Sequence, residues 1–474
     1  MHRRPEEGTD MSEKKKGKEL MDKLGYKFEH IAKKAPEDVD KAIAFCEDYK
    51  KFMDASKTER ECCAYVRSLA DKEGYREFDA AGSYKAGDKL YYVNRGKNII
   101  LVTVGKKPLE DGVRFNIAHI DSPRLDLKPF PLYENDEIAY FKTHYYGGIR
   151  KYQWGTIPLA MHGVVMLKDG TRVDINIGEK DDDPKFVISD LLPHLSAKQN
   201  KRPLNEGLKG EELNIIIGNI PYQDDDVKEG FKLMALKLLN DRFGMTEADF
   251  TRAEIEMVPA VKATDIGLDR SLVGAYGQDD KVCAYTAVKA AFEIKDPEYT
   301  TVTVLTDKEE IGSEGNTGMA SKALEHFVED LCEVFGAKPR NVYRHSMCLS
   351  SDVNAAYDPT FSDVFDKRNS SLLGHGPVLT KYTGARGKSG SNDASAETMS
   401  KVIACMDKEN VSWQIGELGK VDEGGGGTIA MFMGDMDVDT VDLGVPVLAM
   451  HAPFEVTSKL DIYHTYKAFC AFYR

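Results

Sequence analysis

The sequence predicts an α/β protein that is interrupted by a strand-rich insertion. Segments with helical periodicity alternate with short apolar strands before residue 131 and again after residue 254. Turn signals and apolar alternation replace that order in between. A chain of 474 residues also exceeds the usual size of one domain. We therefore predict a discontinuous domain of residues 1–130 and 255–474 and an inserted domain of residues 131–254.

Composition and net charge exclude several classes of partner. A net charge of −14 repels nucleic acids and anionic membranes, and 42% hydrophobic content is typical of a soluble globular protein. No apolar run approaches the ~20 residues of a membrane span, and residues 1–18 lack the apolar core of a secretory signal. Eight cysteines without a CxxC pair favour a reducing compartment. We predict a cytoplasmic protein without nucleic-acid or membrane partners, with Met11 as an alternative start after a disordered extension.

The first part of the chain predicts a helical region followed by strands. Apolar residues recur at helical spacing within residues 36–74. Three short runs rich in apolar residues follow at 90–93, 98–104 and 113–118, and their composition is typical of strands. The third run leads directly into a histidine, His119.

The middle of the chain predicts strands joined by tight turns. Apolar alternation at 163–167 and 172–177 flanks the dipeptide Asp169-Gly170. An Asp-Gly pair between two such runs predicts a β-hairpin. Residues 230–240 predict a helix near the end of this part.

The last part of the chain returns to helix–strand alternation. Its helices show an apolar face at helical spacing, and its strands are short apolar runs. In chain order we predict a helix at 281–295, a strand at 300–305, a helix at 321–335, strands at 346–350 and 445–450, and a helix at 458–473.

Side chains that can bind metal stand at the ends of several predicted strands. In open α/β sheets, ligands gather outside the carboxyl ends of the strands. Each residue alone is compatible with a solvated loop, but their recurrence at this edge favours a site. Histidines with carboxylates suit zinc or manganese, and a carboxylate shared by two ions suits a two-metal site. The segments carry His119 with Asp121, Asp279, Glu309 with Glu310, Asp352, and His451.

Four sequence blocks carry a resemblance to a known family, and they occur in the same order between about residue 50 and the C-terminus. They are His119-Ile120-Asp121-Ser122-Pro123-Arg124, Asp307-Lys308-Glu309-Glu310-Ile311-Gly312-Ser313, Ser351-Asp352 and Met450-His451. They resemble the aspartyl aminopeptidase / vacuolar aminopeptidase I family of two-zinc exopeptidases. The resemblance implies an α/β metallopeptidase domain, built on a mixed sheet with helices on both faces, and an inserted β-rich dimerisation domain. It also implies peptide substrates and a homo-oligomer, a tetrahedral dodecamer whose active sites face an inner chamber.

The resemblance also implies a set of metal ligands. By position, His119 and Asp352 would hold one divalent ion, and Glu310 and His451 would hold the other. Asp279 would bridge the two ions. Zinc is the expected metal, and manganese and cobalt are alternatives that the same ligands accept.

Further roles follow from the same resemblance. Asp279 is chosen over Asp280 because the family's ligand is the first residue of an Asp-Asp or Asp-Asn pair. Asp121 would be the carboxylate that orients a ligating imidazole, and Glu309 would be the general base that takes a proton from the attacking water. His162 matches a family histidine that reaches the active site of a neighbouring subunit; the alternative is a strand histidine that faces solvent.

Substrate preference is the least determined feature. The resemblance favours N-terminal Asp or Glu, and an acidic side chain in a shielded pocket needs a cation. Lys381, Arg386 and Lys388 lie in the corresponding substrate loop, although residues 382–392 replace that loop's aromatic segment and 424–427 extend a glycine-rich one. A broad or aliphatic preference is the alternative. Two different kinds of protein compete with an aminopeptidase: a carboxypeptidase or deacylase with the same two-metal core, and a non-enzymatic scaffold.

Overall fold

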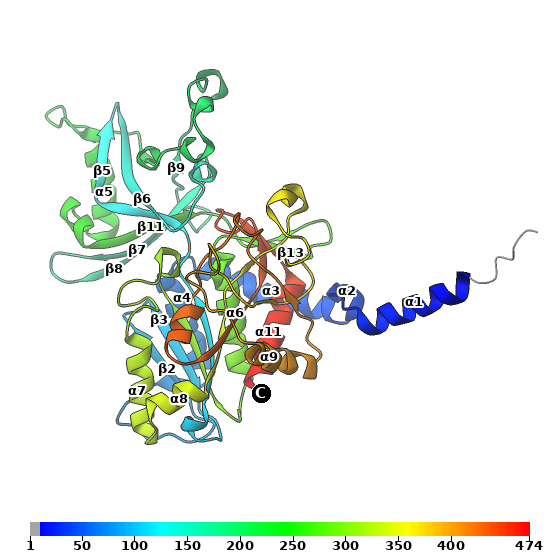
Figure 1. Ribbon diagram of the computed structural model, residues 1–474. Coiled ribbons are helices and arrows are strands. Elements are labelled where there is room, and N and C mark those ends of the chain that lie inside the picture. The colour runs from blue at the N-terminus through cyan, green and yellow to red at the C-terminus, as the bar shows by residue number, and fades with distance from the viewer. Residues whose placement is uncertain (1–9) are drawn as a thin grey trace, which may run out of the picture.

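The computed structural model describes residues 10–474, with side-chain environments from Lys16 onward, so residues 1–9 of the expected N-terminal extension lie outside it. Three sheets of nine, seven and five strands organise the described chain. The nine- and seven-stranded sheets form separate lobes, and helix α1 (Asp10–Leu24) extends away from both (Figure 1). A short helix, α2 (Ile31–Lys34), leads into the body of the protein.

The nine-stranded sheet is mixed. Strand β14 is parallel to β4, β4 to β15, β15 to β19 and β17 to β18. Strand β3 runs antiparallel to both of its neighbours, and β17 runs antiparallel to β19. The parallel strands are almost fully buried, as expected for a sheet that is covered on both faces. Across the sheet the order is β1 (Arg76–Glu77), β2 (Lys89–Asn94), β3 (Asn98–Thr103), β14 (Thr300–Thr306), β4 (Val113–His119), β15 (Met347–Ser350), β19 (Asp439–Gly444), β17 (Val378–Thr380) and β18 (Gln414–Ile415).

Helices cover both faces of this sheet. Alternate strand residues form two separate hydrophobic cores, because successive side chains of a strand point to opposite faces. One core is closed by α3 (Asp38–Ala55), α4 (Glu59–Lys72), α6 (Gln278–Glu293), α9 (Ala396–Lys408) and α11 (Lys459–Tyr473). The other is closed by α7 (Ala323–Phe335), α8 (Pro339–His345) and α10 (Ala430–Asp435).

The seven-stranded sheet is antiparallel and has its own hydrophobic core. The predicted hairpin at Asp169-Gly170 joins β7 to β8. The sheet begins at Arg124 and ends at Pro259, slightly outside the limits 131–254 of the predicted insertion. Its order is β8 (Arg172–Ile177), β7 (Leu159–Met166), β11 (Ala253–Pro259), β5 (Arg124–Asn135), β6 (Ile138–Tyr146), β10 (Ile215–Gly218) and β9 (Val187–Ile188), with α5 (Gly230–Phe243) beside it.

In the five-stranded sheet, one predicted strand has different bounds. The sequence predicts a single strand at 445–450, but β20 ends at Leu448, because Ala449 and His451 have positive φ angles of 56° and 65°. The strand of this region that enters the main sheet is β19, which the sequence pattern does not predict. The small sheet has the order β12 (Thr264–Ile266), β13 (Leu272–Ala275), β21 (Glu455–Ser458), β20 (Pro446–Leu448) and β16 (Asn354–Ala355).

The helical region predicted at 36–74 is two helices, α3 and α4. Thr58 separates them: its hydroxyl accepts the Glu61 N–H while the Glu61 side chain accepts the Thr58 N–H, a capping box that starts α4.

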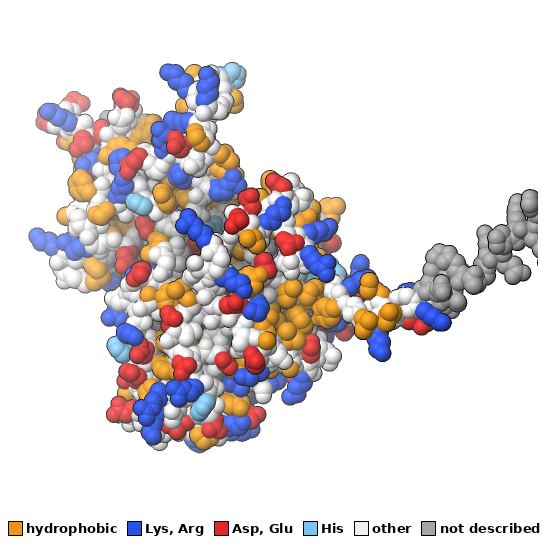
Figure 2. Space-filling view, viewed as in Figure 1, with side chains coloured by type: hydrophobic (Ala, Val, Ile, Leu, Met, Phe, Trp, Pro, Cys, Tyr) orange, Lys and Arg blue, Asp and Glu red, His pale blue; other side chains and the backbone are white. Residues whose placement is uncertain are grey.

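All eight cysteines are free. Among the described helices, none combines the length and apolarity needed to cross a bilayer. Acidic and basic side chains are mixed over the visible face, without a large region of one sign (Figure 2).

Candidate active site

Three adjacent strands of the nine-stranded sheet end at one group of polar side chains. His119 is the last residue of β4, and Asp352 follows β15 by two residues. Glu309 and Glu310 follow β14 in a single 3₁₀ turn, Glu309–Ile311. Because β14, β4 and β15 are parallel neighbours, their carboxyl ends bring these residues together.

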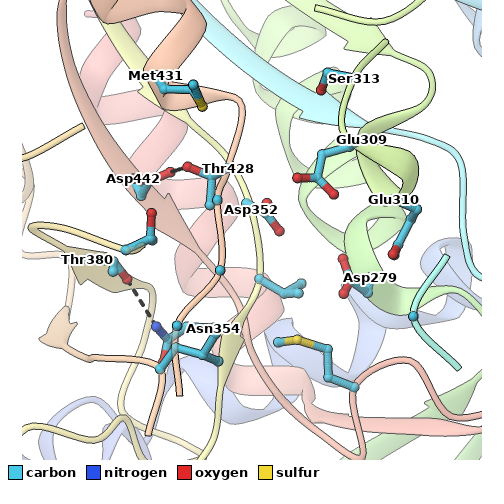
Figure 3. A pocket seen from close by; sticks show the side chains of 18 of the residues that line it. Asp279, Glu309, Glu310, Ser313, Asp352, Asn354, Thr380, Thr428, Met431 and Asp442 are labelled. Atoms are coloured by element: carbon cyan, nitrogen blue, oxygen red, sulfur yellow. Dashed lines mark hydrogen bonds between the residues drawn. The ribbon is translucent and has the colours of Figure 1, made fainter. Parts of the chain in front are cut away.

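Two further side chains reach this edge from other elements. Asp279 stands at the start of α6, directly after Gly277 and Gln278, where Gly277 has a positive φ of 72°. His451 lies in the turn between β20 and β21 of the small sheet. Figure 3 shows Asp279 beside Glu309 and Glu310 on one side of a cavity, with Asp352 facing them.

These side chains form two groups that can each hold a metal ion. The first is His119, Asp279 and Asp352, and the second is Asp279, Glu310 and His451. Within each group, the ligand atoms all lie within 4.8 Å of one another. Asp279 belongs to both groups: its Oδ1 is 3.2 Å from His119 Nε2, and its Oδ2 is 3.2 Å from His451 Nε2.

Both histidines are oriented by acceptors at Nδ1. His119 Nδ1 lies 3.1 Å from the carbonyl oxygen of Asp121 and 3.3 Å from its Oδ1. His451 Nδ1 lies 2.8 Å from the carbonyl oxygen of Gly148. An acceptor at Nδ1 holds the proton there and leaves Nε2 with its lone pair free for a metal.

The charge of the cluster fits divalent cations. Burial raises the pKa values of Glu310 and Asp352, and the charge of Asp279 adds to the effect at Glu310. Glu310 Oε1 is buried and accepts no hydrogen bond from the described residues. Buried carboxylates close together repel one another unless protons or metal ions compensate them. The nitrogen and oxygen donors are those that zinc accepts.

Glu309 stands apart from both ligand groups. Its Oε2 lies 3.8 Å from His119 Nε2, and its backbone N–H donates to Asp121 Oδ1 at 3.2 Å. Burial raises its pKa to about 7. A carboxylate with a pKa near 7 that borders an open cavity can accept a proton from water at neutral pH.

The cluster opens into a cavity of about 460 Å³. The glycine run 425–427 and Thr428 form part of its wall. Thr428 Oγ1 donates to Asp442 Oδ1 at 2.8 Å across the cavity from Glu309 (Figure 3). Asp442 is 3% exposed, and burial raises its pKa to about 6. The apolar part of the wall consists of Val353, Leu418, Met431, Phe432 and Met450.

The three loop cations predicted for substrate binding do not line this cavity. Lys381 and Lys388 both form ion pairs with Asp393, and Lys388 Nζ also lies 3.7 Å above the ring of Tyr382. Arg386 and Lys388 line an adjoining cavity of about 240 Å³, which shares Thr383, Leu418 and Gly425 with the first.

His162 lies away from the cavity of its own chain. It is on β7 with 1% of its surface exposed, between Glu61 Oε1 at 2.8 Å from Nδ1 and Glu179 Oε1 at 3.1 Å from Nε2. Within its own chain His162 therefore does not face solvent, unlike the solvent-facing strand histidine that the sequence left as the alternative. Its role in a neighbouring subunit stays a prediction.

Three residues at the site are not predicted from the sequence, and each has a physical reason for this. The Tyr146 hydroxyl donates to Asp121 Oδ2 at 2.8 Å, but the surrounding sequence predicts only a tyrosine on a strand. Gly148 contributes a carbonyl oxygen, which no side-chain pattern can reveal. Asp442 reaches the cavity from β19, a strand that the sequence pattern does not predict.

Comparison with known proteins finds one family. The model of the family described as aminopeptidase I zinc metalloprotease (M18) matches residues 52–473. A relative from Clostridium acetobutylicum, a probable M18 family aminopeptidase 1, is 49% identical over 438 residues, which are 91% of this chain and 94% of the relative.

Solved structures show the same fold. The M18 aminopeptidase of Thermotoga maritima matches with a TM-score of 0.90 and 42% identity over 95% of this chain and 99% of that one. The mApe1 dodecamer of S. cerevisiae matches with a TM-score of 0.73 over 90% of this chain and 96% of that one. At 20% identity, this second likeness is one of fold alone.

Proposed function

Because this chain belongs to the M18 family of aminopeptidase I zinc metalloproteases, we propose that it removes the N-terminal residue of peptides at a site that holds two zinc ions. The observation that carries the proposal is the position of Asp279. Its two carboxylate oxygens each face one histidine at 3.2 Å, as a bridging ligand requires. His119 and Asp352 would complete one metal site.

The second metal site would consist of Glu310 and His451 with the shared Asp279. When bound, the zinc ions would polarise the scissile carbonyl and lower the pKa of the attacking water. Manganese and cobalt are substitutes for zinc that the same nitrogen and oxygen donors accept.

The chain's own residues move the proton. A Glu309 carboxylate oxygen accepts the proton of the attacking water, and the same oxygen then donates it to the nitrogen of the departing peptide. Asp121 supports this role, because it accepts the backbone N–H groups of Glu309 and Glu310, both at 3.2 Å, and lies beside the His119 ring. The catalytic carboxylate and the imidazole are thereby held by one buried acid.

We further propose a preference for neutral, apolar N-terminal residues over acidic ones, the second of the two preferences compatible with the sequence. No lysine or arginine of the described chain lines the catalytic cavity. An acidic substrate side chain would lose its hydration close to Asp352 and Asp442 with no lysine or arginine to compensate its charge. The walls near Met431 and Phe432 instead offer apolar contact.

A substrate panel tests this preference. We expect kcat/KM for a leucyl substrate to exceed that for an aspartyl substrate by roughly 10-fold or more, in line with the worth of apolar pocket contacts. Replacing Lys381, Arg386 and Lys388 singly by Ala should leave this ratio unchanged. If aspartyl substrates are preferred and these variants raise their KM selectively, the acidic preference is correct.

The same panel separates the competing activities. Hydrolysis only of C-terminal residues or of N-acyl groups would indicate the carboxypeptidase or deacylase. A metal-free protein without hydrolytic activity would indicate the scaffold. N-terminal acetylation of a cleaved peptide is the matched control, because it removes the free amine while leaving the first peptide bond in place.

We also propose a homo-oligomer of twelve subunits with its active sites on an inner chamber. Support comes from the dodecamer described for the fold relative and from apolar side chains exposed on the lobe of the seven-stranded sheet. These are Phe130, Leu192, Leu195, Leu204 and Ile220. The division of the chain into residues 1–130 with 255–474 and an insertion of 131–254 would make that lobe the interface-forming domain.

Light scattering tests the assembly. The native particle is expected to have twelve times the 52.9 kDa mass of the chain. Dissociated forms should lose activity, and His162→Ala should lower kcat in particles of unchanged mass. A fully active monomer would contradict both the assembly and the role predicted for His162.

A further inference from the structure

Three consecutive residues from the lobe of the seven-stranded sheet contact the proposed catalytic site of the other lobe. Tyr146, at the end of β6, donates its hydroxyl to Asp121 Oδ2 at 2.8 Å. Gly147 packs so closely on Glu310 that a Cβ there would lie 3.2 Å from Glu310 Oε2. Gly148 accepts a hydrogen bond from His451 Nδ1 at 2.8 Å. The segment therefore contacts two residues of the second proposed metal group, Glu310 and His451, and Asp121, which accepts the backbone N–H of Glu309.

Asp121 links this segment to the proposed base, Glu309, because it accepts hydrogen bonds from both. Its side chain is fully buried, and a buried carboxylate keeps one position only while donors surround it. It receives the N–H groups of Glu309 and Glu310 from one lobe and the Tyr146 hydroxyl from the other. Asp121 Oδ2 thus accepts two hydrogen bonds, one from the Tyr146 hydroxyl and one from the Glu310 N–H.

Tyr146 is itself rigidly placed. The Arg124 guanidinium lies 3.8 Å from the centre of its ring, in the geometry of a cation–π contact. Arg124 is in turn paired with Asp126 at 2.8 Å, Glu256 at 3.3 Å and Glu59 at 3.6 Å. Glu59 begins α4 and Glu256 lies on β11, so the ring is supported by elements of both lobes.

We propose that Tyr146 is a positioning residue for the hydrolysis: its hydroxyl fixes the Asp121 carboxylate, which fixes the backbone of Glu309 and the ring of His119. This inference rests on the proposed function. It makes the seven-stranded lobe part of the catalytic apparatus within a single chain, in addition to any role at a subunit interface.

The test is Tyr146→Phe, which removes the hydroxyl and keeps the ring for Arg124. Loss of a partner that orients a metal-site residue typically costs ~10–100-fold, so we expect kcat to fall by that factor with KM changed less than about twofold. Tyr140→Phe is the matched control, since Tyr140 lies on the same strand and stacks on Tyr133 away from the site. The control should match the wild type.

Hydrogen–deuterium exchange provides a readout that needs no activity. Peptides spanning residues 307–313 carry the Glu309 and Glu310 amides that Asp121 accepts. In zinc-loaded protein, Tyr146→Phe should increase exchange in these peptides at least several-fold, while Tyr140→Phe should not.

Three results would overturn the inference. They are an unchanged kcat, a change confined to KM, and a lower kcat with unaltered exchange at residues 307–313. If the wild-type enzyme releases no N-terminal residue from any peptide, the proposed function fails, and the exchange data still decide whether Tyr146 holds this turn. Wild-type activity with an equally active Tyr146→Phe enzyme refutes the positioning role alone.

Discussion

Glu309→Gln is expected to retain zinc and to lose most of its turnover. Glutamine keeps the size and polarity of the side chain but cannot accept a proton from water at neutral pH. A positioned general base is commonly worth ~10²–10⁴-fold, so kcat should fall by that range while KM changes little. Glu309 belongs to neither ligand group, so metal content should stay at the wild-type value. Steady-state kinetics and elemental analysis of the same preparation measure both quantities.

The matched control for this variant is Glu314→Gln. Glu314 is exposed and lies five positions further along the same connection, so it carries the same chemical change outside the cavity. Its kcat should equal that of the wild type. Wild-type turnover in Glu309→Gln would show that Glu309 is not the general base. The raised pKa of Glu309 would then have no role in catalysis.

Asp279→Ala is expected to abolish hydrolysis by a different route, the loss of both zinc ions. Asp279 is the one residue shared by the two ligand groups, and each group retains only two protein ligands without it. Two ligands are too few for a stable zinc site, which normally has at least three from the protein. Elemental analysis after dialysis should therefore give less than one zinc per chain.

Glu310→Ala provides the comparison, because Glu310 belongs to only one group. This variant should keep the zinc held by His119, Asp279 and Asp352 and lose the other. Circular dichroism of the metal-free proteins shows whether each variant is folded. Equal zinc contents in folded Asp279→Ala and Glu310→Ala would contradict the bridging role of Asp279.

Much of the main sheet could be predicted because its strands are buried on both faces. Strands β14 and β4 are almost fully buried and rich in β-branched or apolar residues, and a titratable side chain stands at or directly after the end of each, Asp307 after β14 and His119 at the end of β4. The change from apolar to polar marks the carboxyl edge of the sheet. Asp352 after β15 follows the same rule, although Asp279 needed the family resemblance to distinguish it from Asp280.

The parts that could not be predicted depend on contacts between distant segments. Tyr146 and Gly148 reach the site from another sheet, and their own sequence neighbourhood describes only a strand and a turn. The cations of the predicted substrate loop show the same limit. Lys381 and Lys388 suggested a positive pocket, but the chain folds so that Asp393 pairs with both. Charge in a sequence does not reveal which charges compensate one another.

The most direct test of the two-zinc site is anomalous scattering from crystals of the zinc-loaded protein, measured at the zinc absorption edge. Two peaks are predicted about 3.5–4 Å apart, as in other two-metal sites. One should lie beside His119 Nε2 and Asp352, and the other beside His451 Nε2 and Glu310, with one Asp279 oxygen next to each. A single peak between these residues, or zinc bound elsewhere on the chain, would contradict a dinuclear site bridged by Asp279.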